Sequence, residues 1–165
     1  MKKYLAEMIG TMVLVLMGCG TAVSLNCGLD TASVVGTAMA FGLAVVAMAY
    51  TIGGISGCHI NPAITLGCLL TGRISGKDAG MYMIFQVIGA FIGSALLAVL
   101  VSGLTPGGTT TGANACSGDV INGLIAEIVL TAIFVLVVLG TTDEKKGAGN
   151  FAGLAIGLSL ILIHL

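Results

Sequence analysis

The chain has 165 residues, of which 57% are apolar and only 8% carry a charge, and its formal net charge is −1. With a mean hydropathy of +1.13, this composition excludes a water-soluble globular domain and indicates an all-α integral membrane protein. The net charge itself says nothing about partners. The lipid bilayer is the expected surrounding, and no nucleic-acid partner is expected.

Four apolar segments are long enough to cross a bilayer, which needs about 20 residues in a helix. They are residues 4–25, 33–54, 79–103 and 120–140, and a fifth segment, 151–165, begins in the same way. The first segment follows Met1-Lys2-Lys3 and is long enough to span, so we interpret it as a membrane span and not as a cleaved signal peptide. The sequence therefore predicts five spans.

A polar patch marked by Gly and Pro, residues 56–65, lies between the second and third spans. Pro62 is suited to the first turn of a helix, with Asn61 before it as the N-cap. The apolar run that follows closes at 71–73, so a helix over 61–72 reaches only about half the bilayer thickness. We predict a re-entrant half helix that begins near the membrane midplane and returns to the side from which it came.

The basic residues support this topology independently of the patch. They are Lys2, Lys3, Arg73, Lys77, Lys145 and Lys146. If the segment 61–72 does not cross, all six lie on one side of the membrane, and the loops on the other side have none. Basic loops face the cytoplasm, so the sequence predicts a multi-pass protein of the cell inner or plasma membrane with a cytoplasmic N-terminus.

The sequence also contains an internal repeat. A shift of 120 places Ala6-Glu7 on Ala126-Glu127, and a shift of 115 places Gly42-Leu43 on Gly157-Leu158. Three spans separate the two copies, so the second copy is inverted, and inverted repeats place a substrate path near the midplane.

The repeat divides the chain into a first repeat (1–103, with the half helix 61–72), an extracellular loop (104–118) and an incomplete second repeat (119–165). The counterpart of Asn61 would fall at position 176, beyond Leu165. A second half helix and a sixth span are therefore expected to be missing.

These motifs resemble those of a known family. The run Ser-Gly-Cys-His-Ile-Asn-Pro-Ala at 56–63 is similar to the first Asn-Pro-Ala box of the aquaporins, the major intrinsic protein family. Residues 6–11 and 126–127 resemble the family's signatures in its first and fourth spans, and 154–165 resembles its fifth span. The resemblance implies a passive channel for water, a homotetramer with one pore per subunit, no enzymatic activity and no cofactor.

The resemblance implies a role for each residue of the box. The Asn61 amide, beside Pro62 and Ala63, would donate a hydrogen bond to a passing water molecule. The carbonyl groups of Gly57, Cys58 and His59 would replace the hydration shell that the water loses. The His59 ring is expected to bond within the protein, and the three residues match the family's ladder of acceptors.

Phe41 and His164 match the positions of the family's narrow filter, with one residue in the second span and one in the fifth. A ring opposite an imidazole would leave a bore about one water molecule wide. Relatives that pass glycerol have a small residue where His164 stands, so the pair favours water.

Glu7 and Glu127 are carboxylates inside predicted spans, where a charge is costly and calls for a purpose. The resemblance implies that both are structural buried acids that accept hydrogen bonds from pore-loop backbone. A proton relay is the alternative for this pair.

Three other functions remain open from the sequence. One is a facilitator of glycerol or other small neutral solutes from the same family. The second is a coupled transporter, which would need ionisable residues along its path, where only Glu7 and Glu127 qualify. The third is a non-conducting fragment, because the second box and the filter arginine that follows it in the family are missing. An enzyme is disfavoured, because neither a catalytic triad nor a metal-ligand cluster is evident.

Overall fold

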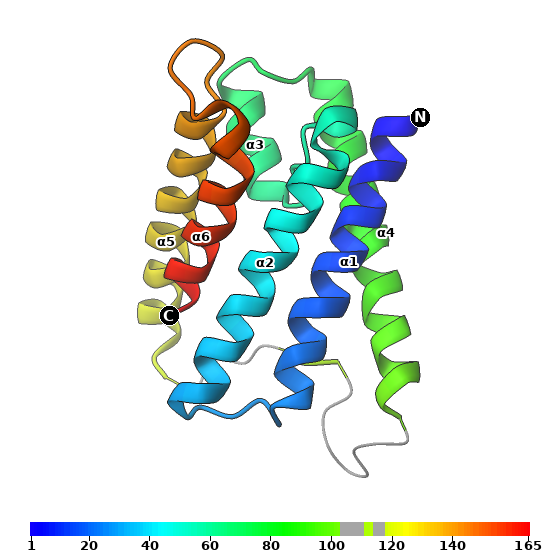
Figure 1. The fold of residues 1–165 in the computed structure, drawn as a ribbon, viewed down its shortest axis with the longest axis vertical. Coiled ribbons are helices and arrows are strands. Elements are labelled where there is room, and N and C mark those ends of the chain that lie inside the picture. Colours follow the sequence, from blue (N-terminus) through cyan, green and yellow to red (C-terminus); the bar gives the residue numbers. More distant parts are fainter. Residues whose placement is uncertain (103–110, 114–117) are drawn as a thin grey trace.

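The computed structural model describes residues 1–102, 111–113 and 118–165, and all regular structure in these ranges is helical (Figure 1). The predicted loop 104–118 lies mostly outside the described residues. The elements are α1 (Lys2–Ser24), α2 (Thr31–Ser56), α3 (Pro62–Leu70), α4 (Gly76–Val101), α5 (Val120–Thr141), the 3₁₀ turn η1 (Gly149–Phe151) and α6 (Ala152–His164).

Four of these helices, α1, α2, α4 and α5, are long and apolar enough to span a membrane. They coincide with the four predicted spans to within a few residues at either end. The fifth predicted segment is helical as well, but Gly149–His164 is shorter than the other four. The all-α transmembrane fold class expected from the composition is therefore confirmed.

The half helix is present and shorter than the spans. α3 has nine residues, which is about 14 Å of helix at ~1.5 Å per residue. It ends at Leu70, slightly before the predicted boundary, because Thr71 caps it and Gly72 adopts a left-handed φ of 73° that turns the chain. Figure 1 shows α3 confined to the end of the bundle that holds the N-terminus.

The connections alternate between the two ends of the bundle. In Figure 1 the N-terminus, the α3–α4 turn and the α5–α6 loop lie at one end, and the α1–α2 loop lies at the other. The six basic residues belong to those three segments and to the helix ends beside them. The structure therefore gathers them at one end, as the re-entrant reading of 61–72 requires.

Glycines allow two helix pairs to approach closely. α4 packs against α1 at Gly89 and Gly93, where a Cβ atom would collide with the backbone carbonyl groups of Met8 and Met12. Small residues at such crossings let backbones meet without a side chain between them. The pair α1 and α4 thus forms one wall of the bundle.

The crossing of α2 and α6 is reciprocal. A Cβ atom on Gly42 would meet the Gly157 carbonyl and Ile161, and one on Gly157 would meet the Gly42 carbonyl and Val46. The shift of 115 converts each set into the other. A pseudo-two-fold axis between inverted repeats would produce such a reciprocal crossing. The boundaries of the first repeat (1–103), the loop (104–118) and the second repeat (119–165) stay a prediction.

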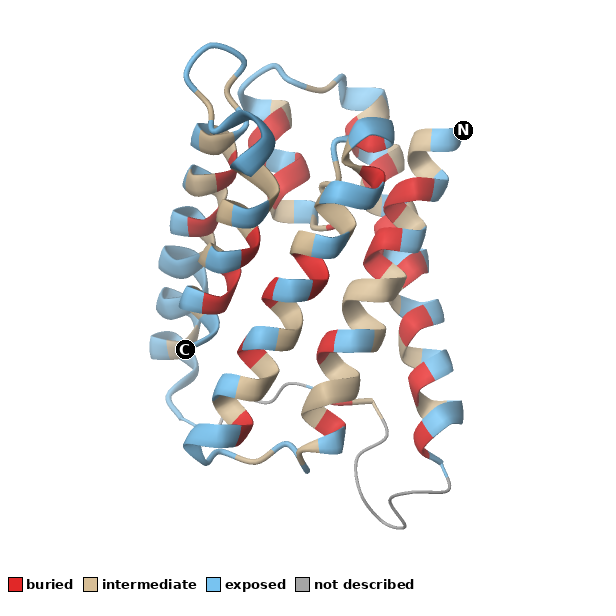
Figure 2. Cartoon of the chain, in the orientation of Figure 1, coloured by how far each residue is buried: buried red, intermediate tan, exposed pale blue. Residues whose placement is uncertain are grey.

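Burial is uneven across the bundle (Figure 2). The main core joins residues of α1, α2, α3, α5 and α6 with Ile60 of the α2–α3 loop. By contrast, α5 buries only Phe134 and Val138, both in its second half. The first half of α5 is therefore largely exposed within the described structure.

Candidate functional site

The α2–α3 loop, residues 57–61, has an unusual backbone. Gly57 ends α2 with a φ of 84°, and Cys58 and Ile60 follow with φ of 53° and 42°. The left-handed region is open to glycine but costs other residues about 1–2 kcal/mol each. A loop of this shape persists only where its surroundings hold it in place.

The Glu7 side chain of α1 holds this loop in place by hydrogen bonds. Its Oε1 accepts hydrogen bonds from Ser56 Oγ at 2.6 Å and from the His59 backbone N–H at 2.9 Å. Its Oε2 accepts from the Ile60 backbone N–H at 2.6 Å and from Gln86 Nε2 at 2.7 Å. The side chain is 0% exposed. All four partners donate, which suits an ionised carboxylate that can only accept.

Two polar residues that the sequence analysis did not single out, Gln86 and Tyr82, complete this network. Gln86 is 1% exposed and also donates to Thr65 Oγ1 at 3.1 Å. Tyr82 donates from its hydroxyl to the Ser56 backbone carbonyl at 2.7 Å. A signal was available, because Gln86 interrupts an otherwise apolar predicted span, and polar groups inside spans are rare without a partner.

Asn61 caps α3 as the sequence predicted. Its Oδ1 accepts from the Ala63 backbone N–H at 2.7 Å, its backbone is extended, and Pro62 occupies the first helical position. Because this bond uses the amide oxygen, the Nδ2 group is left to donate elsewhere. The N-terminus of α3 adds its partial positive charge at the same place.

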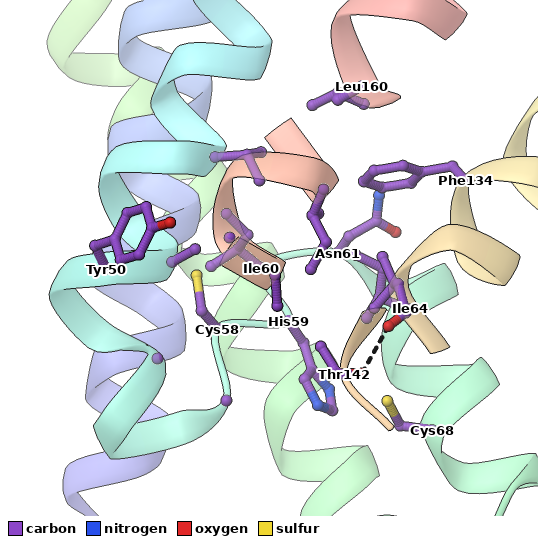
Figure 3. A pocket seen from close by; sticks show the side chains of 18 of the residues that line it. Tyr50, Cys58, His59, Ile60, Asn61, Ile64, Cys68, Phe134, Thr142 and Leu160 are labelled. Carbon is purple, nitrogen blue, oxygen red and sulfur yellow. Dashed lines mark hydrogen bonds between the residues drawn. The ribbon is translucent and has the colours of Figure 1, made fainter. Parts of the chain in front are cut away.

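A cavity of about 540 Å³ opens beside this helix end (Figure 3). Its lining comes from α1, α2, the α2–α3 loop, α3, α5 and α6. The loop residues Gly57, Cys58, His59 and Asn61 form one polar part of the wall, and apolar side chains such as Phe134 form another part. We call this space the central cavity. It can accept a small solute between a hydrogen-bonding wall and an apolar one.

Arg73 and Thr142 line the central cavity at the end of the bundle that holds the N-terminus. The Arg73 guanidinium donates to the Leu139 carbonyl and to Thr142 Oγ1, both at 2.9 Å. It thereby satisfies a carbonyl group at the C-terminus of α5 that the helix itself leaves open. The turn after α3 is thus fastened to the end of α5, a contact that the sequence did not predict.

Asp143 begins the α5–α6 loop next to this clamp. Its carboxylate accepts from the backbone N–H groups of Lys145 and Lys146 at 2.9 Å each, and lies 3.7 Å from Arg73. Those backbone bonds, and then the Arg73 charge, lower the pKa of Asp143 below its usual 3.8. The carboxylate that orders this loop is therefore charged at neutral pH.

Phe41 and His164 are brought together, but not across a bore. Their rings stack with centroids 5.0 Å apart and an angle of 17° between the planes. The Phe41 ring lies against Gly18 of α1, which has no side chain to push it away. The two rings are therefore in contact and do not face each other across a bore, and neither residue lines the central cavity. Their assignment to a narrow filter stays a prediction.

Glu127 also differs from its prediction as a buried acid. It is exposed, whereas its repeat partner Glu7 is fully buried. The buried residues of α5, Phe134 and Val138, lie about two turns or more beyond it, so Glu127 lies on the exposed half of the helix. Within the described residues, no group of three or more His, Cys, Asp or Glu side chains could hold a metal ion.

Comparisons with known proteins agree with this geometry. A family model described as Major intrinsic protein matches residues 1–165. Aquaporin Z of Rhodopseudomonas palustris is 46% identical over an alignment of 173 residues, gaps included. The alignment covers 99% of this chain and 71% of that protein. Aquaporin Z of Bradyrhizobium diazoefficiens is 43% identical over 175 residues, with 100% and 72% covered.

Among solved structures, the aquaglyceroporin from Plasmodium falciparum superposes with a TM-score of 0.84. It is 24% identical in sequence, and the match covers 99% of this chain and 71% of that one. At this identity the likeness concerns the fold alone.

Proposed function

This chain belongs to the major intrinsic protein family, and on that premise we propose that it is a passive transmembrane channel for water. One observation supports the proposal above the others. The N-terminus of a half helix, capped by Asn61, opens into the central cavity, and the loop before it is held by a buried carboxylate. The molecule is accordingly a multi-pass membrane protein and a transporter in the broad sense.

The wall of the central cavity would supply the hydrogen-bond partners that a water molecule loses when it leaves bulk solvent. The carbonyl groups of Gly57, Cys58 and His59 would accept its hydrogen atoms, and Asn61 Nδ2 would donate to its oxygen. The partial positive charge at the start of α3 would orient each molecule and oppose the entry of cations and protons. No energy source is needed for such a path.

Water is favoured over glycerol because His164 stands where a glycerol facilitator is expected to carry a small residue. In this structure its ring stacks on Phe41 outside the lining of the central cavity. The relatives that are more than 40% identical bear the name Aquaporin Z. The structural relative named as an aquaglyceroporin is 24% identical and adds no argument about the solute.

The setting of the channel follows from the distribution of charge. The end of the bundle with the N-terminus and the basic residues would face the cytoplasm, because basic loops are retained on that side. The membrane would be the bacterial inner membrane, given relatives from bacteria. A homotetramer with one path per subunit is proposed from the family.

Vesicles that contain the protein test this function. In an osmotic gradient of sucrose they are expected to shrink faster than empty vesicles, and in a glycerol gradient they should re-swell no faster than empty ones. Asn61→Asp keeps the helix cap but removes the Nδ2 donor and adds a negative charge, so water flux should fall several-fold. Equal shrinkage with and without the protein would contradict the channel and support the non-conducting alternative, and rapid glycerol entry would favour the facilitator.

A further inference from the structure

The hydroxyl of Thr65 has more neighbours than one hydrogen atom can serve. Thr65 is 0% exposed, and its Oγ1 lies 3.1 Å from the Asn61 backbone carbonyl, 3.1 Å from His59 Nδ1 and 3.1 Å from Gln86 Nε2. A hydroxyl donates one hydrogen bond and accepts two. The roles of the three neighbours therefore decide where each hydrogen atom lies.

The role of Gln86 is determined by Glu7. The Glu7 carboxylate accepts only, so the Gln86 amide must turn its Nε2 toward Oε2, at 2.7 Å. The second hydrogen on Nε2 then reaches Thr65 Oγ1. Gln86 Oε1, which is buried and has no partner among the described residues, cannot replace Nε2 without facing the carboxylate. Thr65 accordingly accepts one hydrogen bond from Gln86.

Only one arrangement then satisfies all three contacts. Thr65 donates its hydrogen to the Asn61 carbonyl, which can only accept, and its second lone pair is left for His59. His59 must therefore donate from Nδ1. In the other arrangement Thr65 donates to a bare Nδ1, and its contact with the Asn61 carbonyl has no hydrogen atom. The first arrangement makes three hydrogen bonds and the second makes two, and buried polar groups favour full pairing.

We propose that Thr65 is a positioning residue that holds the His59 imidazole with its hydrogen on Nδ1, so that Nε2 faces the central cavity as a hydrogen-bond acceptor. His59 and Gly57 both line that cavity. The Nε2 edge of the ring lies toward Gly57, because a Cβ atom there would be 3.7 Å from Nε2 and from Cδ2. Of the two ring nitrogens, only Nδ1 bonds to a described residue.

What this means for transport rests on the proposed function. With Nε2 bare, the Asn61 amide is the one strong hydrogen-bond donor that this loop presents to the water, since the Cys58 thiol is only a weak donor. A hydrogen on Nε2 would place a second donor within the same wall and oppose the orientation that Asn61 sets. The tautomer itself does not depend on transport.

The experiment is nitrogen-15 NMR of the full chain in lipid vesicles, labelled at histidine. The chain has two histidines, and His164→Gln leaves His59 as the one imidazole to be observed. The expected spectrum places the hydrogen on Nδ1 of His59. Thr65→Val should shift the population toward a hydrogen on Nε2, and Thr65→Ser, which keeps the hydroxyl, should restore the original spectrum.

Thr11→Val is the matched control. Thr11 is also buried in a helix and donates to the carbonyl four residues before it, Glu7 O at 2.8 Å. Among the described residues it makes no hydrogen bond to an imidazole. Its variant should leave the His59 spectrum unchanged, and Thr65→Val should slow water flux where Thr11→Val does not.

Two results would overturn the inference. One is a parent spectrum with the hydrogen on Nε2, which needs no substitution at Thr65 and so stands even if Thr65→Val does not fold. The other is a Thr65→Val spectrum with unchanged populations. Loss of water flux in the parent protein with the expected spectrum would refute the proposed function alone.

Discussion

Glu7 shows at the scale of single residues why a charge is retained inside an apolar bundle. Its two oxygens accept four hydrogen bonds, two of them from consecutive backbone N–H groups of a loop in left-handed conformations. Hydrogen bonds to a charged group contribute about 1.5–3 kcal/mol each. The carboxylate thus offsets both its own desolvation and the strain of the loop.

We expect Glu7→Gln to destabilise the protein by about 3 kcal/mol, because the amide nitrogen cannot accept and would face donors. Unfolding of the protein in mixed micelles by increasing denaturing detergent measures this change. Glu127→Gln is the matched control, since Glu127 is the repeat partner of Glu7 and is exposed. If both variants lost the same stability, the hydrogen bonds to Glu7 would not be what holds the loop.

At the scale of elements, the length of α3 decides what the loop before it can do. A helix of nine residues cannot span the bilayer, so its N-terminus and the irregular loop lie at membrane depth. Such backbone is tolerated there only when protein buries it or when it lines a cavity. Here both conditions hold, because Glu7 binds the loop on one side and the central cavity opens on the other.

The packing of α4 on α1 gives a prediction at this scale. Gly89→Ala would place a Cβ atom against the Met8 backbone carbonyl, so the two helices must separate, at a cost of about 1–3 kcal/mol. Gly80→Ala lies on the same helix with nothing within 4 Å of its Cβ and should be neutral or slightly stabilising. Thermal unfolding of the two variants in detergent compares them, and equal melting temperatures would contradict close packing at Gly89.

At the scale of the whole molecule, helix α1 is buried more extensively in the bundle than α5, its counterpart in the repeat. α1 contacts α2 and α4 along its length and buries Glu7, whereas the corresponding helix α5 buries only two residues and exposes Glu127. The reciprocal crossing of Gly42 and Gly157 relates the two halves. In the first half the α2–α3 loop therefore covers the buried Glu7, whereas Glu127 is exposed in the described part of the second half.

The topology is tested by which amines an impermeant reagent reaches from one side of sealed vesicles. Lys77 and Lys145 should react from the same side, because α3 does not cross and both lie at the end of the bundle with the N-terminus. A lysine introduced by Asn26→Lys in the α1–α2 loop should react from the opposite side only. Reaction of Lys77 and Lys145 from opposite sides would disprove the re-entrant half helix.

Much of this architecture could be predicted from local pattern. Apolar length determined the spans, and Asn61-Pro62 before a short apolar run determined where α3 begins, because capping and proline geometry depend on neighbours in the chain. The positions of the basic residues determined which loops share a side. The repeat and the box were enough to identify the family.

Only the tertiary structure decided how residues far apart in the chain meet. Glu7 accepts hydrogen bonds from groups 49 to 79 positions away, two of them in the α2–α3 loop. Gln86, Tyr82 and Arg73 contribute to the site although no sequence motif marks them. The stack of Phe41 on His164 and the exposure of Glu127 also departed from expectation. Burial and hydrogen-bond partners are properties of packing between elements, and the spacing of residues along one chain does not specify them.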